Sequence, residues 1–363
     1  MKKYQVCNRC VMDNSSDKTI SFDKEGICNY CTDAITRKST VYFPDSRGAI
    51  KLEALLHKIK NEGKGKEFDC IMGISGGLDS SYLLYMGYKW GLRILAVHID
   101  DGFDTEISKE NIRKLVDATG VNFKILQPNA LQFNDLTKAY IRSGVPNLAV
   151  PQDNLIFAYM YQYARRYKIR HFLSGGNFSL ESILQRDNTY RAFDVTNIRT
   201  IHRIYGEKSI DKLNLLSDYR RFFDQKVLRI ETHRPLDYID YKRDQALLEL
   251  NQFCGFEYYG SKHLENKLTK FVQLFWFFNK FGVDKRRSHL SSLIITEQIT
   301  RDEALKVLAE PMYDKDDMNK EIDEILETLD MTRNEFDQIM KNPPKQHEEY
   351  KTDWFYPIFK RLF

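Results

Sequence analysis

The sequence lacks an apolar run long enough to cross a membrane. Its most apolar stretch, residues 271–281, spans about 11 residues and has Lys270 and Lys280 at its ends, whereas a spanning helix needs roughly 20. The N-terminus, MKKYQVCNRC, has two lysines but no apolar segment after them, which is not typical of a signal peptide. These absences predict a soluble, cytoplasmic chain without a membrane partner.

A strong excess of one charge is also absent. Lys and Arg total 55 and Asp and Glu total 51, so the 363 residues carry a net charge of +4. This small charge does not favour a nucleic-acid partner, although a local basic pocket would suffice for a small anionic substrate. The chain has no internal repeat or low-complexity tract. Its length predicts two or three domains, and its 42% hydrophobic content can fill their cores.

Four of the six cysteines fall into two tight pairs, Cys7–Cys10 and Cys28–Cys31, which are 17 residues apart. In a long chain without an export signal, such pairs indicate a metal site rather than disulfides. Four thiolates suit tetrahedral Zn²⁺ and close its coordination shell, so we expect a structural zinc. An iron–sulfur cluster and unmetallated thiols are the alternatives.

The pattern of apolar segments divides the chain into three units. Residues 1–60 hold the cysteine pairs and a helix over 49–60, and a polar linker follows at 61–66. Residues 61–240 alternate strands with helices, which predicts a doubly wound α/β fold with a parallel sheet. Residues 241–363 are charged and helix-rich. The expected strands are 68–74, 93–99, 122–126 and 171–173; the expected helices are 81–90, 105–119, 131–142, 152–167, 242–251, 264–280, 301–308, 319–329 and 333–341.

The strongest functional signal is the segment SGGLDS, residues 75–80, between the first expected strand and a helix. At such a junction several backbone N–H groups lack partners, and the helix dipole adds positive potential. Glycines at Gly76 and Gly77 let an anion approach the backbone closely, and the hydroxyls of Ser75 and Ser80 add donors. The segment therefore predicts a phosphate-binding loop.

An aspartate stands in this loop where a Walker A loop has a lysine. A carboxylate beside a polyphosphate needs a cation between them, so we expect Asp79 to help hold Mg²⁺. The segment resembles the PP-loop of the ATP pyrophosphatase superfamily. That resemblance implies an adenine nucleotide alpha hydrolase-like domain that cleaves ATP to AMP and pyrophosphate and transfers AMP to a substrate oxygen, with Ser75 and Asp79 in the catalytic site.

Three further segments are expected near this loop. His98 and Asp100 end the second strand, where members of the superfamily receive adenosine. Either Asp100 or Asp101 is a candidate to contact ribose or a metal, and a solvated turn is an equal alternative. Gly175 and Gly176 end the fourth strand at the same edge of the sheet, where nucleotides bind. Lys262 resembles the lysine that stabilises departing pyrophosphate in asparagine synthetase-like enzymes, although residues 260–267 also suit an ordinary helix start.

The chain lacks the residues of a glutaminase. Lys2 stands after Met1, where an N-terminal nucleophile would need cysteine, and neither Cys70 nor Cys254 lies on the elbow turn of a triad-type glutaminase. We therefore expect ammonia to be free or supplied by a separate subunit.

Together, CNRC and CNYC near the N-terminus, SGGLDS, and the C-terminal stretches YYGSKHLENKLTKF and KFGVDKRRSHLSSLI resemble the N-acetyl sugar amidotransferases of bacterial lipopolysaccharide O-antigen and flagellin-sugar biosynthesis. The resemblance implies ATP-dependent conversion of an acetamido group on a nucleotide-activated sugar into an acetamidino group. It also implies partners similar to the glutaminase and cyclase subunits of imidazole glycerol phosphate synthase.

Several alternatives remain open from the sequence. The basic run at 284–289 suits the nucleoside diphosphate of the sugar, the pyrophosphate pocket or a solvated helix cap. A PP-loop enzyme that thiolates tRNA would need a reactive cysteine, for which Cys254 is the candidate, and a broad basic face. A non-enzymatic zinc-ribbon scaffold would show no release of pyrophosphate from ATP.

Overall fold

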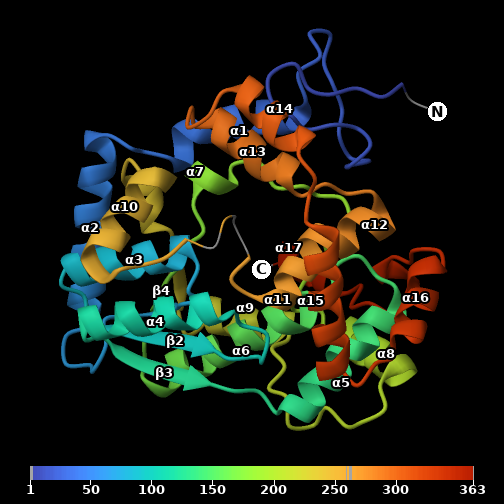
Figure 1. The fold of residues 1–363 in the computed structure, drawn as a ribbon. Coiled ribbons are helices and arrows are strands. Elements are labelled where there is room, and N and C mark those ends of the chain that lie inside the picture. Colours follow the sequence, from blue (N-terminus) through green and yellow to red (C-terminus); the bar gives the residue numbers. More distant parts are fainter. Residues whose placement is uncertain (1–2, 259, 261–263, 363) are drawn as a thin grey trace.

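A parallel sheet forms the centre of the molecule. The computed structural model describes residues 3–258, 260 and 264–362 (Figure 1). Its five strands are β1 (Cys70–Gly73), β2 (Ile94–Ile99), β3 (Asn122–Leu126), β4 (His171–Leu173) and β5 (Glu231–His233). They lie in the order β3-β2-β1-β4-β5, and every neighbouring pair is parallel. The predicted doubly wound α/β fold is confirmed.

Helices cover both faces of this sheet, as a parallel sheet requires. Side chains alternate along β1, so Cys70 and Met72 pack in one cluster and Ile71 packs in another. The first cluster joins the sheet to α2 (Ser46–Glu62), α3 (Leu78–Lys89), α4 (Glu106–Thr119) and α10 (Arg243–Cys254). The second joins it to α6 (Val150–Arg166). Figure 1 shows α2, α3 and α10 together on one side of the strands.

Most elements of the α/β region start and end within a few residues of the predicted positions. The strands at 122–126 and 171–173 match the observed bounds, and the predicted helix at 105–119 corresponds to α4. Local chemistry sets the ends of α4: the Thr105 side chain accepts a hydrogen bond from the Ser108 N–H, and Gly120 ends the helix in a left-handed conformation. Strand β5 was not predicted, because its three residues, Glu-Thr-His, include no apolar side chain.

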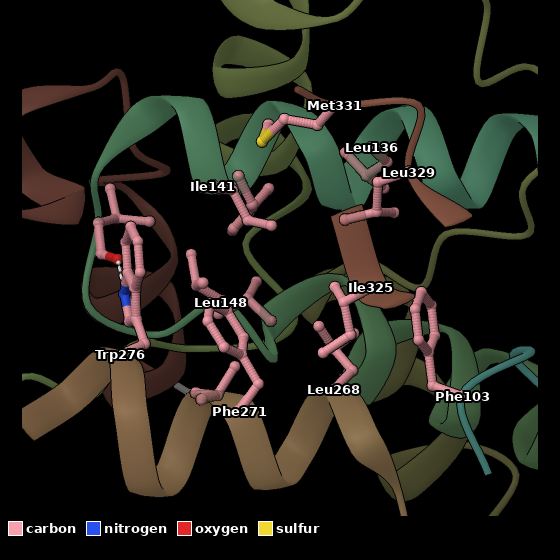
Figure 2. Packing of buried hydrophobic residues seen from close by; sticks show 14 of the residues in the cluster. Phe103, Leu136, Ile141, Leu148, Leu268, Phe271, Trp276, Ile325, Leu329 and Met331 are labelled. Carbon is pink, nitrogen blue, oxygen red and sulfur yellow. Dashed lines mark hydrogen bonds between the residues drawn. The ribbon is translucent and has the colours of Figure 1, made fainter. Parts of the chain in front are cut away.

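A second large core lies beside the sheet. It joins α5 (Ala130–Ser143) and α8 (Val195–Tyr205) to helices from the end of the chain, and Figure 2 shows its close packing. Trp276 is fully buried, and its indole N–H donates to the Val145 carbonyl at 2.9 Å. Removing such an aromatic side chain typically costs about 3–5 kcal/mol, so this core ties the C-terminal helices firmly to α5.

The C-terminal helices differ from prediction at residues 264–280, and the helices at Arg286–Ile295 and Tyr356–Leu362 were not predicted. The single helix expected over 264–280 begins at Lys267 and contains a π-helical turn: α11 (Lys267–Lys270), the turn Phe271–Trp276 and α12 (Phe277–Phe281). The rest of this region comprises α13 (Arg286–Ile295), α14 (Arg301–Ala309), α15 (Lys315–Thr328), α16 (Arg333–Lys341) and α17 (Tyr356–Leu362). The other helices are α1 (Asn29–Val41), α7 (Phe178–Glu181) and α9 (Asp218–Lys226), with 3-10 turns at Pro235–Tyr238 and His347–Glu349.

Candidate nucleotide-binding site and metal centre

The loop after β1 has the backbone of an anion-binding nest. Gly76 adopts a φ of +74°, and Gly77 starts α3 without a capping side chain, a backbone arrangement typical of anion-binding loops. A Cβ on Gly76 would lie 2.4 Å from the Ser108 carbonyl oxygen, so only glycine fits there. Ser75 and Ser80 hold the loop, since the Ser75 N–H donates to the Ser80 Oγ at 3.2 Å.

The loop after β4 packs against the loop after β1. A Cβ on Gly175 would lie 3.0 Å from the backbone carbon of Asp79 and the nitrogen of Ser80, so this glycine allows the close approach. Next to it, the Gly176 N–H donates to the Ser174 Oγ at 3.2 Å. Strands β1 and β4 are neighbours, yet the chain continues from β1 to the opposite side, at β2. The two loops therefore meet at the switch point where open α/β sheets bind ligands.

These loops enclose a cavity of about 400 Å³. Ser75, Gly77, Asp79, Ser80, Gly175 and Gly176 all line it, so the structure brings these predicted residues together. Gly76 lies in the same loop but outside the lining. Other lining side chains are Glu181, Arg243, Tyr258, Glu265 and His289, which come from distant segments. Three carboxylates on the wall would repel a polyphosphate unless a cation lay between them, and oxygen ligands are those that Mg²⁺ prefers.

Asp79 has a partner that sequence reasoning missed. The hydroxyl of Tyr241 donates to the Asp79 Oδ1 at 2.6 Å, and the Tyr241 side chain is almost fully buried. A buried hydrogen bond to a carboxylate fixes the direction in which the other oxygen points. Nothing in the local sequence around Tyr241 indicates this role, because the contact joins residues 162 positions apart.

A second cavity of about 290 Å³ adjoins the first and shares Ser75 and Glu265 with it. His98 lines this cavity, but both of its ring nitrogens are engaged: Nδ1 with the Ile74 carbonyl at 2.9 Å and Nε2 with Asp104 Oδ2 at 2.9 Å. Burial acts to lower the pKa of His98, yet the hydrogen bond and charge of Asp104 outweigh it and raise that pKa. The ring therefore braces the end of β1 against the loop after β2.

Asp100 is not among the side chains that line either cavity; it accepts hydrogen bonds from the Gln127 amide at 2.8 Å and the Gly102 N–H at 3.1 Å. Its neighbour Asp101 lines the second cavity instead, together with Asp153 from the first turn of α6.

Both of these carboxyl groups are perturbed by burial. Burial raises the pKa of Asp101 to about 6, with a further contribution from the charge of Asp104, and burial alone raises the pKa of Asp153 to about 6. Within the described part of the chain, the Asp153 side chain has no hydrogen-bond or ion-pair partner, so it is available to a ligand. The sequence signal for Asp153 was weak, because an acidic residue in the first turn of a helix is common.

The predicted Lys262 lies outside the described residues. Beyond it, Glu265 accepts a hydrogen bond from the Ser75 hydroxyl at 3.2 Å, and its backbone carbonyl accepts from Thr105. The segment that follows residue 262 therefore contacts the loop after β1 and the start of α4.

The four predicted cysteines converge near the N-terminus. Their sulfur atoms lie within 4.8 Å of one another and are fully buried, with Cys7–Cys31 at 3.8 Å and Cys10–Cys28 at 3.7 Å. A tetrahedral zinc with Zn–S bonds of about 2.3 Å has S···S edges of about 3.8 Å. Backbone N–H groups point at the sulfurs, including that of Cys28 toward the Cys7 Sγ at 3.2 Å. This donor set is consistent with zinc.

The basic run at 284–289 attaches this cysteine cluster to the rest of the chain. Arg287 forms an ion pair with buried Asp13 at 3.1 Å and donates to the Val11 carbonyl, while Arg286 pairs with Asp284. Arg301 likewise donates to the Cys7 and Cys10 carbonyls. The two arginines of the run thus make internal contacts, which none of the alternatives suggested by the sequence included. Only His289 of this run reaches the first cavity.

A second group of possible metal ligands comprises His171, Glu231 and His233 between the sheet and α2. The His171 Nδ1 lies 3.0 Å from the His233 Nε2, and Lys58 forms an ion pair with Glu231 at 2.5 Å. Because the Lys58 ammonium is already paired with the Glu231 carboxylate, we interpret these three residues as an internal polar network rather than a cation site.

Two regions whose residues line the first cavity match known protein families. Residues 69–184, which carry both glycine loops, match the queuosine biosynthesis protein QueC family. They form a PP-loop ATP pyrophosphatase domain, which marks an ATP-using enzyme. Residues 265–362 match the C-terminal domain of WbpG-like LPS biosynthesis proteins. The chain therefore joins a QueC-like ATP-using domain to a WbpG-like LPS biosynthesis domain.

Several solved structures are similar at low identity. They include NH3-dependent NAD synthetase from Campylobacter jejuni subsp. jejuni NCTC 11168 with nitrate (14% identity, 56% of this chain and 83% of that chain, TM-score 0.30). NMN synthetase from Francisella tularensis is 13% identical over 66% and 97%, with a TM-score of 0.30. U34-tRNA thiolase NcsA from Methanococcus maripaludis with its [4Fe-4S] cluster is 13% identical over 85% and 90%, with a TM-score of 0.33.

No curated protein matches the chain. Within the described residues, no helix combines the length and apolar character needed to cross a membrane.

Proposed function

We propose that this chain is an AMP-forming amidotransferase of bacterial surface-glycan biosynthesis. It adenylates the acetamido oxygen of a nucleotide-activated N-acetyl sugar and replaces that oxygen with ammonia. The observation that carries the proposal is the shared cavity: Glu265 and His289 of the WbpG-like domain line it together with the PP-loop. Because the two domains build one site, ATP cleavage is coupled to a substrate of LPS biosynthesis.

In this proposal the loop around Ser75, Gly76, Gly77 and Ser80 binds the β- and γ-phosphates through its N–H groups and hydroxyls. Asp79, held by Tyr241, binds Mg²⁺, which neutralises charge on the phosphates. The adenosine occupies the second cavity.

On the adenosine side, His98 braces the wall. Asp101, one of the two aspartates predicted there, and Asp153 face the ribose. Carboxylates accept hydrogen bonds from ribose hydroxyls. Gly175 and Gly176 keep the space beside the phosphates open, and Lys262 is the residue assigned to stabilise the departing pyrophosphate. The four cysteines hold a structural Zn²⁺ that stabilises the N-terminal unit.

The chemistry proceeds in two displacements. The acetamido oxygen attacks the α-phosphorus of ATP, the bond to the β-phosphate oxygen breaks, and pyrophosphate leaves with that electron pair. Ammonia then adds to the imidate carbon and the C–O bond breaks, so AMP departs with the oxygen. One ammonia proton passes to the AMP phosphate or to water, and the sugar keeps an amidinium group. The chain's residues must align the reactants and exclude water during both steps.

The ammonia comes from a separate glutaminase through a cyclase-like subunit. Cys70 is fully buried inside β1, and burial raises the pKa of its thiol. Cys254 ends α10, where its thiol donates to the Leu250 carbonyl at 3.4 Å and burial raises its pKa. Neither thiol lines the cavities described above, so neither of these two cysteines is placed to release ammonia from glutamine. The same position of Cys254 argues against tRNA thiolation.

The test is exchange of labelled pyrophosphate into ATP, screened over nucleotide-linked N-acetyl sugars. We expect exchange with one class of acetamido sugar, and its loss in Asp79→Ala and Ser75→Ala while zinc stays bound. Exchange that persists in both variants would refute the roles of these residues. The absence of exchange with every acetamido sugar, with or without ammonia, would refute the proposed reaction.

A further inference from the structure

A third cavity, of about 880 Å³, lies along β4 and β5 and is also lined by α6 and α9. It shares Phe157, Ser174 and Gly175 with the cavity at the PP-loop. A ligand that fills it can therefore extend one end past Gly175 toward the α-phosphate of ATP. The adenosine cavity shares Gly73 and Ile156 with this cavity but extends to the end of β2, on the other side of β1. Adenosine placed there leaves the space along β4 and β5 to another ligand.

Three cations line this third cavity: Arg221 and Lys226 from α9, and Arg234 after β5. Among the residues that the structure describes, none of the three has a carboxylate partner within ion-pair distance. The adjacent Arg220 lies 3.5 Å from buried Asp224, which also pairs with Arg165. The one carboxylate on the wall, Glu231, is bound by Lys58. The cavity thus has an uncompensated positive charge.

Such a cavity suits a diphosphate. Guanidinium groups bind phosphate oxygens with two parallel hydrogen bonds, and an ammonium adds a point charge. Arg221 is held in place by the Phe193 ring, 4.3 Å from its guanidinium carbon, which lowers the entropy lost on binding. Arg286 and Arg287, which the sequence offered for the diphosphate, are committed to internal contacts instead.

We propose that the third cavity binds the nucleoside diphosphate part of the sugar nucleotide, with Arg221, Lys226 and Arg234 meeting its two phosphates. The sugar then lies beside Ser174 and Gly175, with its acetamido group facing the PP-loop cavity. This inference rests on the proposed function for the identity of the ligand, but the location of the charged site can be measured without turnover.

The experiment measures binding of UDP, GDP, CDP and dTDP, and of UDP-N-acetylglucosamine, by calorimetry. The full chain is first saturated with Mg²⁺ and α,β-methylene ATP, so that the ATP site is occupied. The variants are Arg221→Gln, Lys226→Gln and Arg234→Gln. Arg229→Gln is the matched control, because this substitution removes the same charge. Arg229 is exposed and does not line the cavity.

We expect at least one nucleoside diphosphate to bind with the ATP analogue present. Each of the three lining variants should weaken that binding about tenfold or more, whereas the Arg229→Gln variant stays near wild type and all four variants keep their affinity for the ATP analogue. Binding that also falls steeply with added salt would support the charge argument.

Equal binding in the wild type and the lining variants would overturn the inference, as would complete displacement of the diphosphates by the ATP analogue. The absence of binding by every diphosphate tested would also overturn it. Charge-dependent binding without any pyrophosphate exchange would refute the proposed reaction but not this site. Exchange that is unaffected by the three variants would refute this site alone.

Discussion

Substitution of Gly76 by alanine is the sharpest test of the PP-loop backbone. The new Cβ would lie 2.4 Å from the Ser108 carbonyl oxygen and 2.8 Å from two further Ser108 backbone atoms. An ordinary contact is about 1 Å longer, so the loop or the first turn of α4 must move. The left-handed φ of +74° adds roughly 1–2 kcal/mol for a residue with a side chain, and overpacking typically adds about 1–3 kcal/mol.

Gly120→Ala separates these two costs. Gly120 has a φ of +62° at the end of α4, and a Cβ there would meet nothing within 4 Å. The substitution at this control position therefore introduces backbone strain without a steric clash. We expect Gly120→Ala to lose about 1 kcal/mol of unfolding free energy and to bind Mg²⁺–ATP like the wild type.

Gly76→Ala should lose more stability and weaken Mg²⁺–ATP binding at least ~100-fold, equivalent to about 2.8 kcal/mol. Urea denaturation measures the first effect, and calorimetric titration with an ATP analogue measures the second. If Gly76→Ala binds the analogue as tightly as Gly120→Ala, the nest does not hold the phosphates and the reasoning fails.

Three further predictions concern single side chains. Tyr241→Phe should weaken Mg²⁺-dependent ATP binding roughly 10- to 100-fold, since a hydrogen bond to a charged group contributes about 1.5–3 kcal/mol; unchanged binding would remove Tyr241 from the site. Asp153→Asn should be more stable than the wild type above pH 6. The reason is that the raised pKa of Asp153, about 6, makes wild-type stability fall between about pH 4 and 6; melting temperatures without a pH-dependent difference would contradict this. Arg287→Gln should cost about 3 kcal/mol and speed zinc loss to a chelator while preserving ATP binding, because it leaves Asp13 buried without its cation.

The sequence predicted the parts of the fold that local patterns encode. The strands around Ile71 and Leu95 are short apolar runs, and α4 has a capping threonine and a terminal glycine. The glycine loops and cysteine pairs also follow from spacing within short segments. In each case the residues that determine the structure are neighbours in the chain, so sequence reasoning could find them.

The rest of the site depends on contacts between distant residues. Tyr241 reaches Asp79 across 162 positions, and Asp153 lines the second cavity because α6 packs against β1 and β2. The turn after β2 decides which of Asp100 and Asp101 lines the cavity. The Asp100 side chain accepts a hydrogen bond from Gln127, whereas the Asp101 side chain accepts one from buried Gln152. No local pattern distinguishes two adjacent aspartates, and none assigns Arg287 to Asp13.

The most direct test of the central claim follows the oxygen that leaves the sugar. The acceptor is the nucleotide-linked N-acetyl sugar that supports pyrophosphate exchange, with ¹⁸O in its acetamido carbonyl, supplied with ATP, Mg²⁺ and ammonia. Mass spectrometry of the products should find one ¹⁸O in the phosphate of AMP for each acetamidino group formed, with unlabelled pyrophosphate. Label in orthophosphate alongside ADP, or label that stays in the sugar, would contradict adenylation of the acetamido oxygen.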